Sequence, residues 1–367
     1  MSVHFYNPGY EASVATGNKN YTPSRVVQKF RRDLAFLPLY YKAEWDRVLV
    51  PEDYPRDFWC EDFVTQLDQS DELAPWGWAP ELIGLFGKEK VPYDLGEIYR
   101  WTSRQLSVEL WHNVRDLVPD YFDDLTPPVV LREYSEDIAS SVNRKWVLKG
   151  EFSSSGRGVQ FYDSSDHLRS VLLNRKSRFQ TLILEPYYEK LHDRGYEFYR
   201  NEQGTVEYLG LSSFWTQEAR YIGNWIASPH ILEHEAREIS TFPSHDDYVK
   251  ILTEALSRLP LGKYQGHLGV DTLLFKSPVG NFRLVPCIEM NCRTTMGHLS
   301  LALGQFLASL HLQANFSIIN LHAEPLPSTL RTKTPLFLIS KESLTSGHYP
   351  LTPIFSNTQF VALLEIL

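Results

Sequence analysis

The segment from residue 147 to residue 162, V-L-K-G-E-F-S-S-S-G-R-G-V-Q-F-Y, constrains the fold most. An apolar run ends at Lys149, small residues follow, and a second apolar run begins at Val159, which predicts two strands joined by a loop. Glycine and serine let backbone N–H groups and hydroxyls approach phosphate oxygens, so the loop suits a phosphate-bearing ligand. In a P-loop the lysine follows the glycines, whereas here it precedes them. An ordinary hairpin with a solvated lysine is the alternative.

A second segment, residues 269 to 293, carries acidic and amide side chains on apolar strands. Asp271 lies on one predicted strand, and Glu289 and Asn291 lie on the next. Because they are two residues apart, Glu289 and Asn291 face the same side. Carboxylate and amide oxygens suit Mg²⁺, and Arg293 continues this face with a group that binds anionic oxygens. A solvated strand face is the alternative, but the apolar neighbours predict a buried strand, where acidic groups need partners.

Helical and strand patterns surround these motifs. The spacing of apolar residues predicts helices at 24–41, with Thr22 as N-cap and Pro23 at the first helical position, and at 96–117 and 246–259. Short apolar runs predict strands at 128–131, 145–149, 159–162, 181–184, 269–275 and 282–290, and a hairpin of 196–199 with 206–209. The last forty residues are expected to form a polar loop and a small terminal element.

Composition narrows the class of protein. The formal net charge of −9 argues against a general nucleic-acid or anionic-membrane binder. No apolar run approaches the ~20 residues that a membrane-spanning helix needs. Three cysteines in 367 residues do not make a disulfide framework. The sequence therefore predicts a soluble cytoplasmic protein with more than one subdomain.

The two motifs, in this order and separated by a strand ending in Glu185-Pro186-Tyr187-Tyr188, resemble the ATP-grasp superfamily. The resemblance covers about residues 126–312 and implies an α/β (α+β) fold, in which two α+β subdomains clasp a nucleotide after a small Rossmann-like α/β domain. The implied domains are 1–125 (preceding α/β domain), 126–230 (subdomain with the lysine and the Ser/Gly loop), 231–325 (metal-binding subdomain) and 326–367 (C-terminal extension).

The resemblance also implies a role for individual residues. It implies nucleotide contacts for Lys149, Ser153, Ser154, Ser155, Gly156, Gly158, Glu185, Tyr187, Glu197 and Arg132, metal contacts for Asp271, Glu289 and Asn291, and contacts with the transferred phosphate for Arg293, Arg220 and Asn224. Two features depart from the family pattern. The loop is rich in serine where the family has a glycine run, and Arg132 stands near the place of an earlier family lysine.

The function implied by the resemblance is that of an ATP-dependent carboxylate–amine ligase. Such an enzyme uses ATP and two Mg²⁺ ions, with Mn²⁺ as an alternative, to activate a carboxylate as an acyl-phosphate. A small-molecule or peptide acid and an amine are the implied substrates, with no nucleic-acid or membrane partner. A homodimer is one option for the assembly.

Two other functions are compatible with the sequence, and the role of one tryptophan-rich segment stays open. A nucleotide-binding sensor or degenerate homologue is one, although such a protein does not need a full set of metal ligands. A zinc hydrolase is the other, since residues 230 to 234 read H-x-x-E-H, with His230 and His234 one helical turn apart. The Trp76-Gly77-Trp78 segment either lines a substrate pocket or pins a loop to the core, and core packing is favoured.

Overall fold

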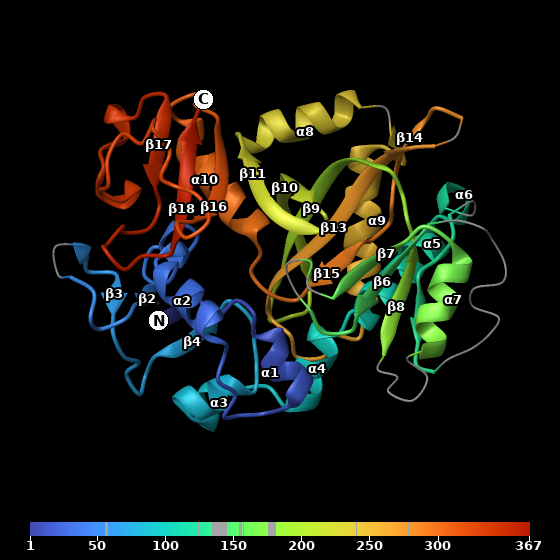
Figure 1. Cartoon of the computed structure of the whole chain (residues 1–367), viewed down its shortest axis with the longest axis horizontal. Helices are drawn as coiled ribbons and strands as arrows, with labels where there is room; N and C mark the ends of the chain where they lie inside the picture. Colours follow the sequence, from blue (N-terminus) through green and yellow to red (C-terminus); the bar gives the residue numbers. More distant parts are fainter. Residues whose placement is uncertain are drawn as a thin grey trace.

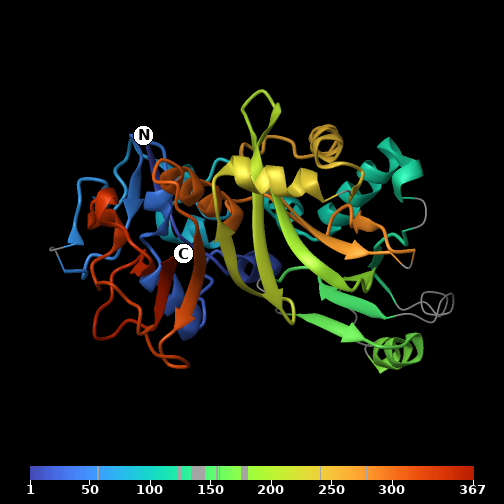
Figure 2. The same cartoon turned by 90° about the horizontal axis from the view of Figure 1, so that it is seen from above.

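The computed structural model spans residues 1–367 and describes residues 1–55, 58–122, 125–133, 145–153, 156, 158–174, 181–239, 241–277 and 279–367. The described strands form three sheets (Figures 1 and 2). In Figure 1 the N-terminal and C-terminal segments lie side by side at one end, and the small sheet of β5 to β8 lies at the other. No helix in these residues combines the length and apolarity needed to span a bilayer.

The N-terminal sheet is parallel, with the strand order β3-β2-β1-β4. Its strands are β1 (Ser2–Phe5), β2 (Arg47–Leu49), β3 (Phe63–Val64) and β4 (Glu72–Pro75). The helices of this region are α1 (Glu11–Thr16), α2 (Arg25–Asp33), α3 (Glu81–Phe86), α4 (Leu95–Thr102), α5 (Gln105–Leu117) and α6 (Pro119–Phe122). Parallel strands need crossover connections, and α1 and α2 lie in the one between β1 and β2. The mixed helix and strand content agrees with the α/β class expected from the sequence.

The small sheet is antiparallel, with the order β5-β8-β6-β7. Its elements are β5 (Val129–Leu131), β6 (Trp146–Gly150), β7 (Val159–Tyr162), α7 (Ser165–Asn174) and β8 (Leu182–Pro186). The predicted strand–loop–strand unit is therefore the β6–β7 hairpin. Residues of this sheet and α7 form a hydrophobic cluster of their own, separate from the main core.

The large sheet has ten strands in the order β12-β14-β13-β9-β10-β11-β16-β18-β17, and β15 pairs with β13 beside this path. Its strands are β9 (Lys190–Arg200), β10 (Val206–Gln217), β11 (Arg220–Ile226), β12 (Thr241–Phe242), β13 (Gly266–Lys276), β14 (Phe282–Leu284), β15 (Glu289–Asn291), β16 (Ala314–Asn320), β17 (Gly347–Pro350) and β18 (Phe360–Ile366). Its helices are α8 (Pro229–Glu238), α9 (His245–Ser257) and α10 (Met296–Ala308). Because β9 pairs with β13, the sequence division at residue 230 does not separate the sheets.

The last forty residues contradict the sequence expectation of a minor element. Strand β18 pairs with β16 and β17 in the large sheet, and Val361 and Leu364 are fully buried. The Asp33 carboxylate of α2 accepts hydrogen bonds of 2.9 and 3.0 Å from the backbone N–H groups of Gln359 and Phe360. The C-terminal strands therefore join the N-terminal region to the large sheet.

Three other expectations need correction. Ser24, not Thr22, caps α2, because its hydroxyl accepts from the backbone N–H of Val27. The expected helix at 96–117 is two helices that break after Thr102. The expected strand at 282–290 is also two strands, since Pro286 has no N–H to give to the sheet and lies between β14 and β15.

Replacing Leu364 by alanine tests whether the C-terminal strand belongs to the core. The side chain is fully buried, so we expect the free energy of unfolding to fall by about 3 kcal/mol in urea denaturation. Leu367→Ala is the matched control, because Leu367 is 58% exposed and its loss leaves stability within about 0.5 kcal/mol. Equal stability of the two variants would contradict a core role for β18.

Candidate functional site

A cavity of about 520 Å³ lies between the small sheet and the large sheet. Strands β6 and β8 contribute to one wall, and β9, β13 and β15 contribute to the other. The predicted site residues that line it are Lys149, Gly156, Glu185, Tyr187, Asp271 and Glu289. Residues from both sequence motifs therefore face one cavity, although they lie far apart in the chain.

Lys149 and Glu185 form a buried ion pair in the wall of this cavity. The Lys149 Nζ lies 2.6 Å from the Glu185 Oε2 and donates a 3.1 Å hydrogen bond to the Ile288 carbonyl. Burial raises the pKa of Glu185, and the charge of Lys149 opposes this shift. The ammonium is therefore held at one point on the cavity wall, between the small sheet and the segment that leads into β15.

Asp271, Glu289 and Asn291 share one face of the large sheet because β13 and β15 are antiparallel. Asp271 is opposite Glu289 in the register, and Gly269 is opposite Asn291. The Asn291 Nδ2 donates a 3.3 Å hydrogen bond to the Asp271 Oδ2. Burial, followed by the charges of Glu289 and Glu197, holds the pKa of Asp271 well above its usual value. The predicted metal ligands therefore lie together, in a place with an excess of negative charge.

This donor set fits a hard divalent cation. The oxygens of Asp271, Glu289 and Asn291 are of the kind that Mg²⁺ prefers, and a cation would relieve the carboxylate repulsion at Asp271. Within the described ranges, no group of three His, Cys, Asp or Glu side chains is placed to hold a metal ion. A cation here therefore needs the amide oxygen, water or ligand oxygens to complete its coordination.

Arg104 is a site residue that the sequence analysis missed. It is buried at the break between α4 and α5, and its Nη2 lies 2.9 Å from the Glu289 Oε1. Its Nη1 donates to the Gly150 carbonyl at 2.9 Å and to the Ser153 hydroxyl. The N-terminal region thus places a guanidinium in the cavity. A helix break after Thr102 would have pointed to Arg104, but the apolar residues continue with helical spacing through 96–117, so the sequence predicted one helix.

The loop after β6 is anchored at its start to the same helix break. The Glu151 Oε1 accepts 2.6 Å hydrogen bonds from the Ser103 hydroxyl and from the Gln105 Nε2. Gly156 and Gly158 both have φ of +74°, which other residues rarely adopt. Ser154 and Ser155, predicted to contact the nucleotide, lie outside the described residues.

Two residues predicted to contact the transferred phosphate, Arg220 and Asn224, do not line the cavity. Gly156 packs against the turn that precedes them. A Cβ at Gly156 would come within 2.4 Å of the Ala219 carbonyl oxygen, in the turn that leads into β11. Arg220, the next residue, is exposed and does not line the cavity. Asn224 is buried, accepts from the Tyr221 hydroxyl and donates to the Ser213 carbonyl at 3.2 Å. The structure therefore brings neither residue to the cavity wall.

Asp193 occupies the cavity where the sequence analysis expected Glu197. Its Oδ2 lies 2.5 Å from the Lys190 Nζ and accepts hydrogen bonds from the Thr216 backbone N–H at 3.1 Å and hydroxyl at 2.9 Å. Both Asp193 and Lys190 line the cavity, whereas Glu197 does not. Asp193 and Glu197 are four residues apart on β9, so both face one side of the sheet at different points along it.

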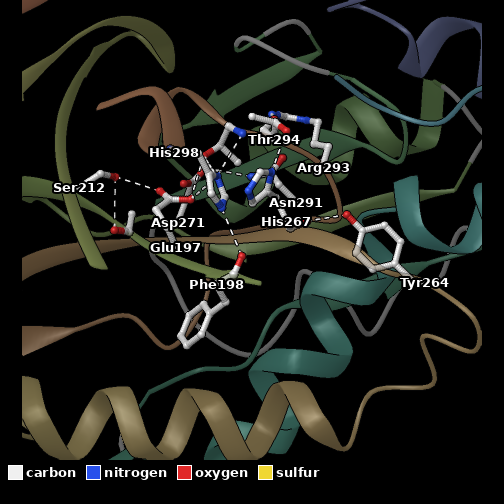
Figure 3. A network of polar contacts seen from close by, with 12 residues as sticks. Glu197, Phe198, Ser212, Tyr264, His267, Asp271, Asn291, Arg293, Thr294 and His298 are labelled. Atoms are coloured by element: carbon white, nitrogen blue, oxygen red, sulfur yellow. Dashed lines mark hydrogen bonds and ion pairs between the residues drawn. The ribbon is translucent and has the colours of Figure 1, made fainter. Parts of the chain in front are cut away.

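Glu197 instead forms a buried network with α10 (Figure 3). Its Oε1 accepts from the Ser212 hydroxyl at 2.9 Å, and its Oε2 accepts from the Thr295 hydroxyl at 2.8 Å. The His298 Nδ1 lies 3.0 Å from the same Oε2. A Cβ at Gly297 would lie 1.7 Å from the Glu197 Oε1, so only glycine leaves room for the carboxyl group.

The Glu197–His298 pair holds its proton on the carboxyl group. Burial raises the pKa of Glu197 to about 7 and lowers the pKa of His298 to about 3. The His298 Nδ1 accepts from the Thr295 backbone N–H at 3.2 Å, and Nε2 lies 3.2 Å from the Phe198 carbonyl, which assigns the ring proton to Nε2. A neutral imidazole therefore faces a protonated carboxyl group between about pH 3 and about pH 7.

The pH dependence of stability tests this assignment. The folded Glu197 carboxyl keeps its proton up to about pH 7, whereas the unfolded one loses it near 4.5. The folded state therefore binds more protons in this window, and the contribution of Glu197 to stability is lost as the pH rises. Glutamine mimics the protonated form at every pH, so we expect Glu197→Gln to match the wild type near pH 4.5.

At pH 8 the glutamine variant should be the more stable by at most about 3 kcal/mol. Urea denaturation in EDTA at several pH values measures the difference, and EDTA removes any bound cation. A difference that does not change with pH would contradict the assignment.

Two other predicted residues lie outside this cavity. Arg293 lines a second cavity, where its Nε lies 3.8 Å from the Glu11 Oε1. Arg132 is exposed and donates a 2.6 Å hydrogen bond to the Gln105 Oε1. Arg132 thus contacts the helix that follows Arg104, and Arg104 is the arginine that reaches the cavity.

The H-x-x-E-H segment forms part of helix α8. The His230 and His234 rings stack at 6.2 Å, and His234 lies 3.9 Å from the Glu238 carboxylate on the exposed face of the helix. Glu233 pairs with Arg237 at 3.2 Å. Among the described side chains no metal-binding group forms here, so a zinc site lacks its third ligand.

Comparisons with known proteins establish the fold. No protein-family model and no curated protein sequence matches the chain. N5-carboxyaminoimidazole synthetase from Staphylococcus aureus superposes with a TM-score of 0.54 at 10% identity, over 100% of this chain and 93% of that one. Biotin carboxylase from Campylobacter jejuni, in its β,γ-ATP complex, gives 0.51 at 12% identity, over 81% of this chain and 71% of that one. Both have the ATP-grasp fold, and this chain shares it.

Proposed function

We propose that this chain, which has the ATP-grasp fold, is an ATP-dependent ligase that activates a carboxylate as an acyl-phosphate and transfers the acyl group to an amine. The observation that carries the proposal is the cavity shared by the Lys149–Glu185 pair and the Asp271–Glu289 edge. A fixed ammonium group and neighbouring carboxylate and amide oxygens are what a magnesium nucleotide requires. The two neighbours named above, N5-carboxyaminoimidazole synthetase and biotin carboxylase, support the reaction type.

The nucleotide would bind between the two sheets. Glu185 and the backbone near Tyr187 would contact the adenine, and the Lys149 ammonium would contact the phosphates. Asp193 is the carboxylate that would accept hydrogen bonds from the ribose hydroxyls, since it lines the cavity and Glu197 does not. The loop around Gly156 would cover the phosphates, because glycine lets backbone N–H groups approach phosphate oxygens closely.

Asp271, Glu289 and Asn291 would hold Mg²⁺, which neutralises phosphate charge when bound. In the first step a carboxylate oxygen of the acid forms a bond to the γ-phosphorus, and the bond to the β-phosphate oxygen breaks to release ADP. In the second step the amine nitrogen bonds to the acyl carbon and inorganic phosphate leaves. Lys149 and Arg104 would stabilise the charge on the phosphates, and the loop would exclude water that hydrolyses the acyl-phosphate.

Calorimetric titration with a non-hydrolysable ATP analogue tests the nucleotide site. We expect magnesium-dependent binding, and we expect Glu289→Gln to weaken that binding by at least about tenfold, because one oxygen ligand loses its charge. Glu254→Gln, an exposed change on α9, is the matched control and should bind like the wild type. Equal affinity for the analogue with and without Mg²⁺ would contradict the assignment of Asp271, Glu289 and Asn291 as Mg²⁺ ligands.

Release of ADP separates a ligase from a protein that only binds nucleotide. With a pool of carboxylic acids and hydroxylamine as the amine, we expect ADP and hydroxamate to form together. Glu289→Gln should lower the rate about a hundredfold, since it weakens the binding of the cation that would neutralise the reacting phosphate. If the wild type binds the analogue tightly but no acid stimulates ADP release, the non-catalytic alternative is the correct one.

A further inference from the structure

Arg104 lies where the N-terminal region meets the two sheets that form the proposed nucleotide cavity. Its backbone N–H donates a 3.2 Å hydrogen bond to the Glu151 carbonyl, at the start of the loop after β6. Three residues further along, in α5, the Ser107 hydroxyl accepts a 2.9 Å hydrogen bond from the backbone N–H of Met290 on β15. The start of α5 is therefore fixed both to the loop and to the strand that carries Glu289.

The guanidinium of Arg104 is not fully used by its protein partners. Its Nη1 donates to the Gly150 carbonyl at 2.9 Å and to the Ser153 hydroxyl, and its Nη2 lies 2.9 Å from the Glu289 Oε1. The Nε–H is buried and has no hydrogen-bond partner among the described residues. The contact with Glu289 is thus a single hydrogen bond, and not the bidentate arrangement that gives the strongest arginine–carboxylate pairs.

In the described part of the chain, each cationic side chain that lines this cavity has a carboxylate neighbour. The nitrogen-to-oxygen distances lie between 2.5 and 3.8 Å, and the pairs are Arg104–Glu289, Lys145–Asp163, Lys149–Glu185 and Lys190–Asp193. Among these carboxylates, Glu289 is also a proposed Mg²⁺ ligand. A cation at this edge therefore competes with Arg104, and not with a lysine, for the charge of Glu289.

This competition depends on what else the cavity holds. Arg104 is only 5% exposed, so water screens its charge weakly, and it repels a divalent cation that shares the Glu289 carboxylate. The phosphates of a nucleotide carry several negative charges and attract both cations. They also offer acceptors to the guanidinium, which then no longer needs the Glu289 oxygen. Phosphate therefore changes the sign of the effect that Arg104 has on cation binding.

We propose that Arg104 couples cation binding to nucleotide binding at the Asp271–Glu289 edge. Without nucleotide, the guanidinium neutralises Glu289 and disfavours a divalent cation there. With nucleotide, the guanidinium donates to phosphate oxygens and leaves the Glu289 carboxylate to the cation. This inference rests on the proposed function, because it requires the nucleotide to bind in this cavity. It adds the order of binding, in which the divalent cation enters with the nucleotide and not before it.

Binding of Mn²⁺ without nucleotide tests the competition. Free Mn²⁺ gives an electron paramagnetic resonance signal that is largely lost on binding, so a titration with protein measures the dissociation constant. We expect Arg104→Gln to bind Mn²⁺ about tenfold more tightly than the wild type, because Glu289 loses its competing partner. Arg100→Gln is the matched control, since it removes the same charge from an exposed position on α4 and should bind Mn²⁺ like the wild type.

Calorimetric titration with the non-hydrolysable ATP analogue, at saturating Mn²⁺, tests the contact with phosphate. We expect Arg104→Gln to bind the analogue about tenfold more weakly than the wild type, because the phosphates lose a guanidinium. A residue that only supported the fold would weaken both titrations, so the opposite signs identify the coupling. Unchanged or weaker Mn²⁺ binding by Arg104→Gln would overturn the proposal.

Arg104→Lys replaces the glutamine variant if that variant does not fold, because lysine keeps the buried charge. A single ammonium group does not reproduce the planar fork that contacts Gly150, Ser153 and Glu289 together. We expect this variant to bind Mn²⁺ about threefold more tightly than the wild type, on the same coupling argument. Mn²⁺ affinity equal to that of the wild type would overturn the proposal here as well.

Analogue binding by the wild type separates failure of this inference from failure of the proposed function. If the wild type binds the analogue with Mg²⁺ but the Arg104 variants bind Mn²⁺ no more tightly than the wild type, the inference is overturned alone. If analogue binding itself is absent, the proposed function fails and the inference fails with it.

Discussion

The register of β13 against β9 and β15 is the constraint on which the candidate site depends. Strand β13 pairs with both neighbours in antiparallel fashion, and Asp271 is opposite Gly195 on one side and Glu289 on the other. A shift of one residue in either pairing would turn these side chains to the opposite face of the sheet. The burial of alternate apolar residues such as Val270 fixes the register, so the core of the sheet also places the carboxylates.

The same register brings carboxylate groups close together, and cationic side chains from separate parts of the chain compensate their negative charge. Glu289 meets Arg104 from the N-terminal region, and Glu185 meets Lys149 within the small sheet. Unpaired carboxylates in a buried edge are costly, so each needs a partner or a proton. At Glu197, which is hydrogen-bonded to the Ser212 and Thr295 hydroxyls, burial favours the protonated form. A bound cation would complete this compensation at Asp271.

Local sequence rules worked best where one element decides the outcome. The β6–β7 hairpin and strand β13 follow from apolar runs and turn residues, and their boundaries agree with the expected ones within a few residues. These rules failed where a contact with a residue far away in the sequence determines the local structure. The break that presents Arg104 is fixed by hydrogen bonds from Ser103 and Gln105 to Glu151, a partner that helical periodicity does not reveal.

The sequence by itself determined the candidate residues of the proposed site: Lys149 beside a small-residue loop, and Asp271, Glu289 and Asn291 on apolar strands. Their spacing is a local property, so strand periodicity was enough to place the last two on one face. The tertiary structure decided which charged groups share a cavity, bringing in Arg104 and Asp193 and placing Arg293 on the second cavity. The reason is that such neighbours depend on sheet order and helix packing, which are set by long-range burial and not by spacing along the chain.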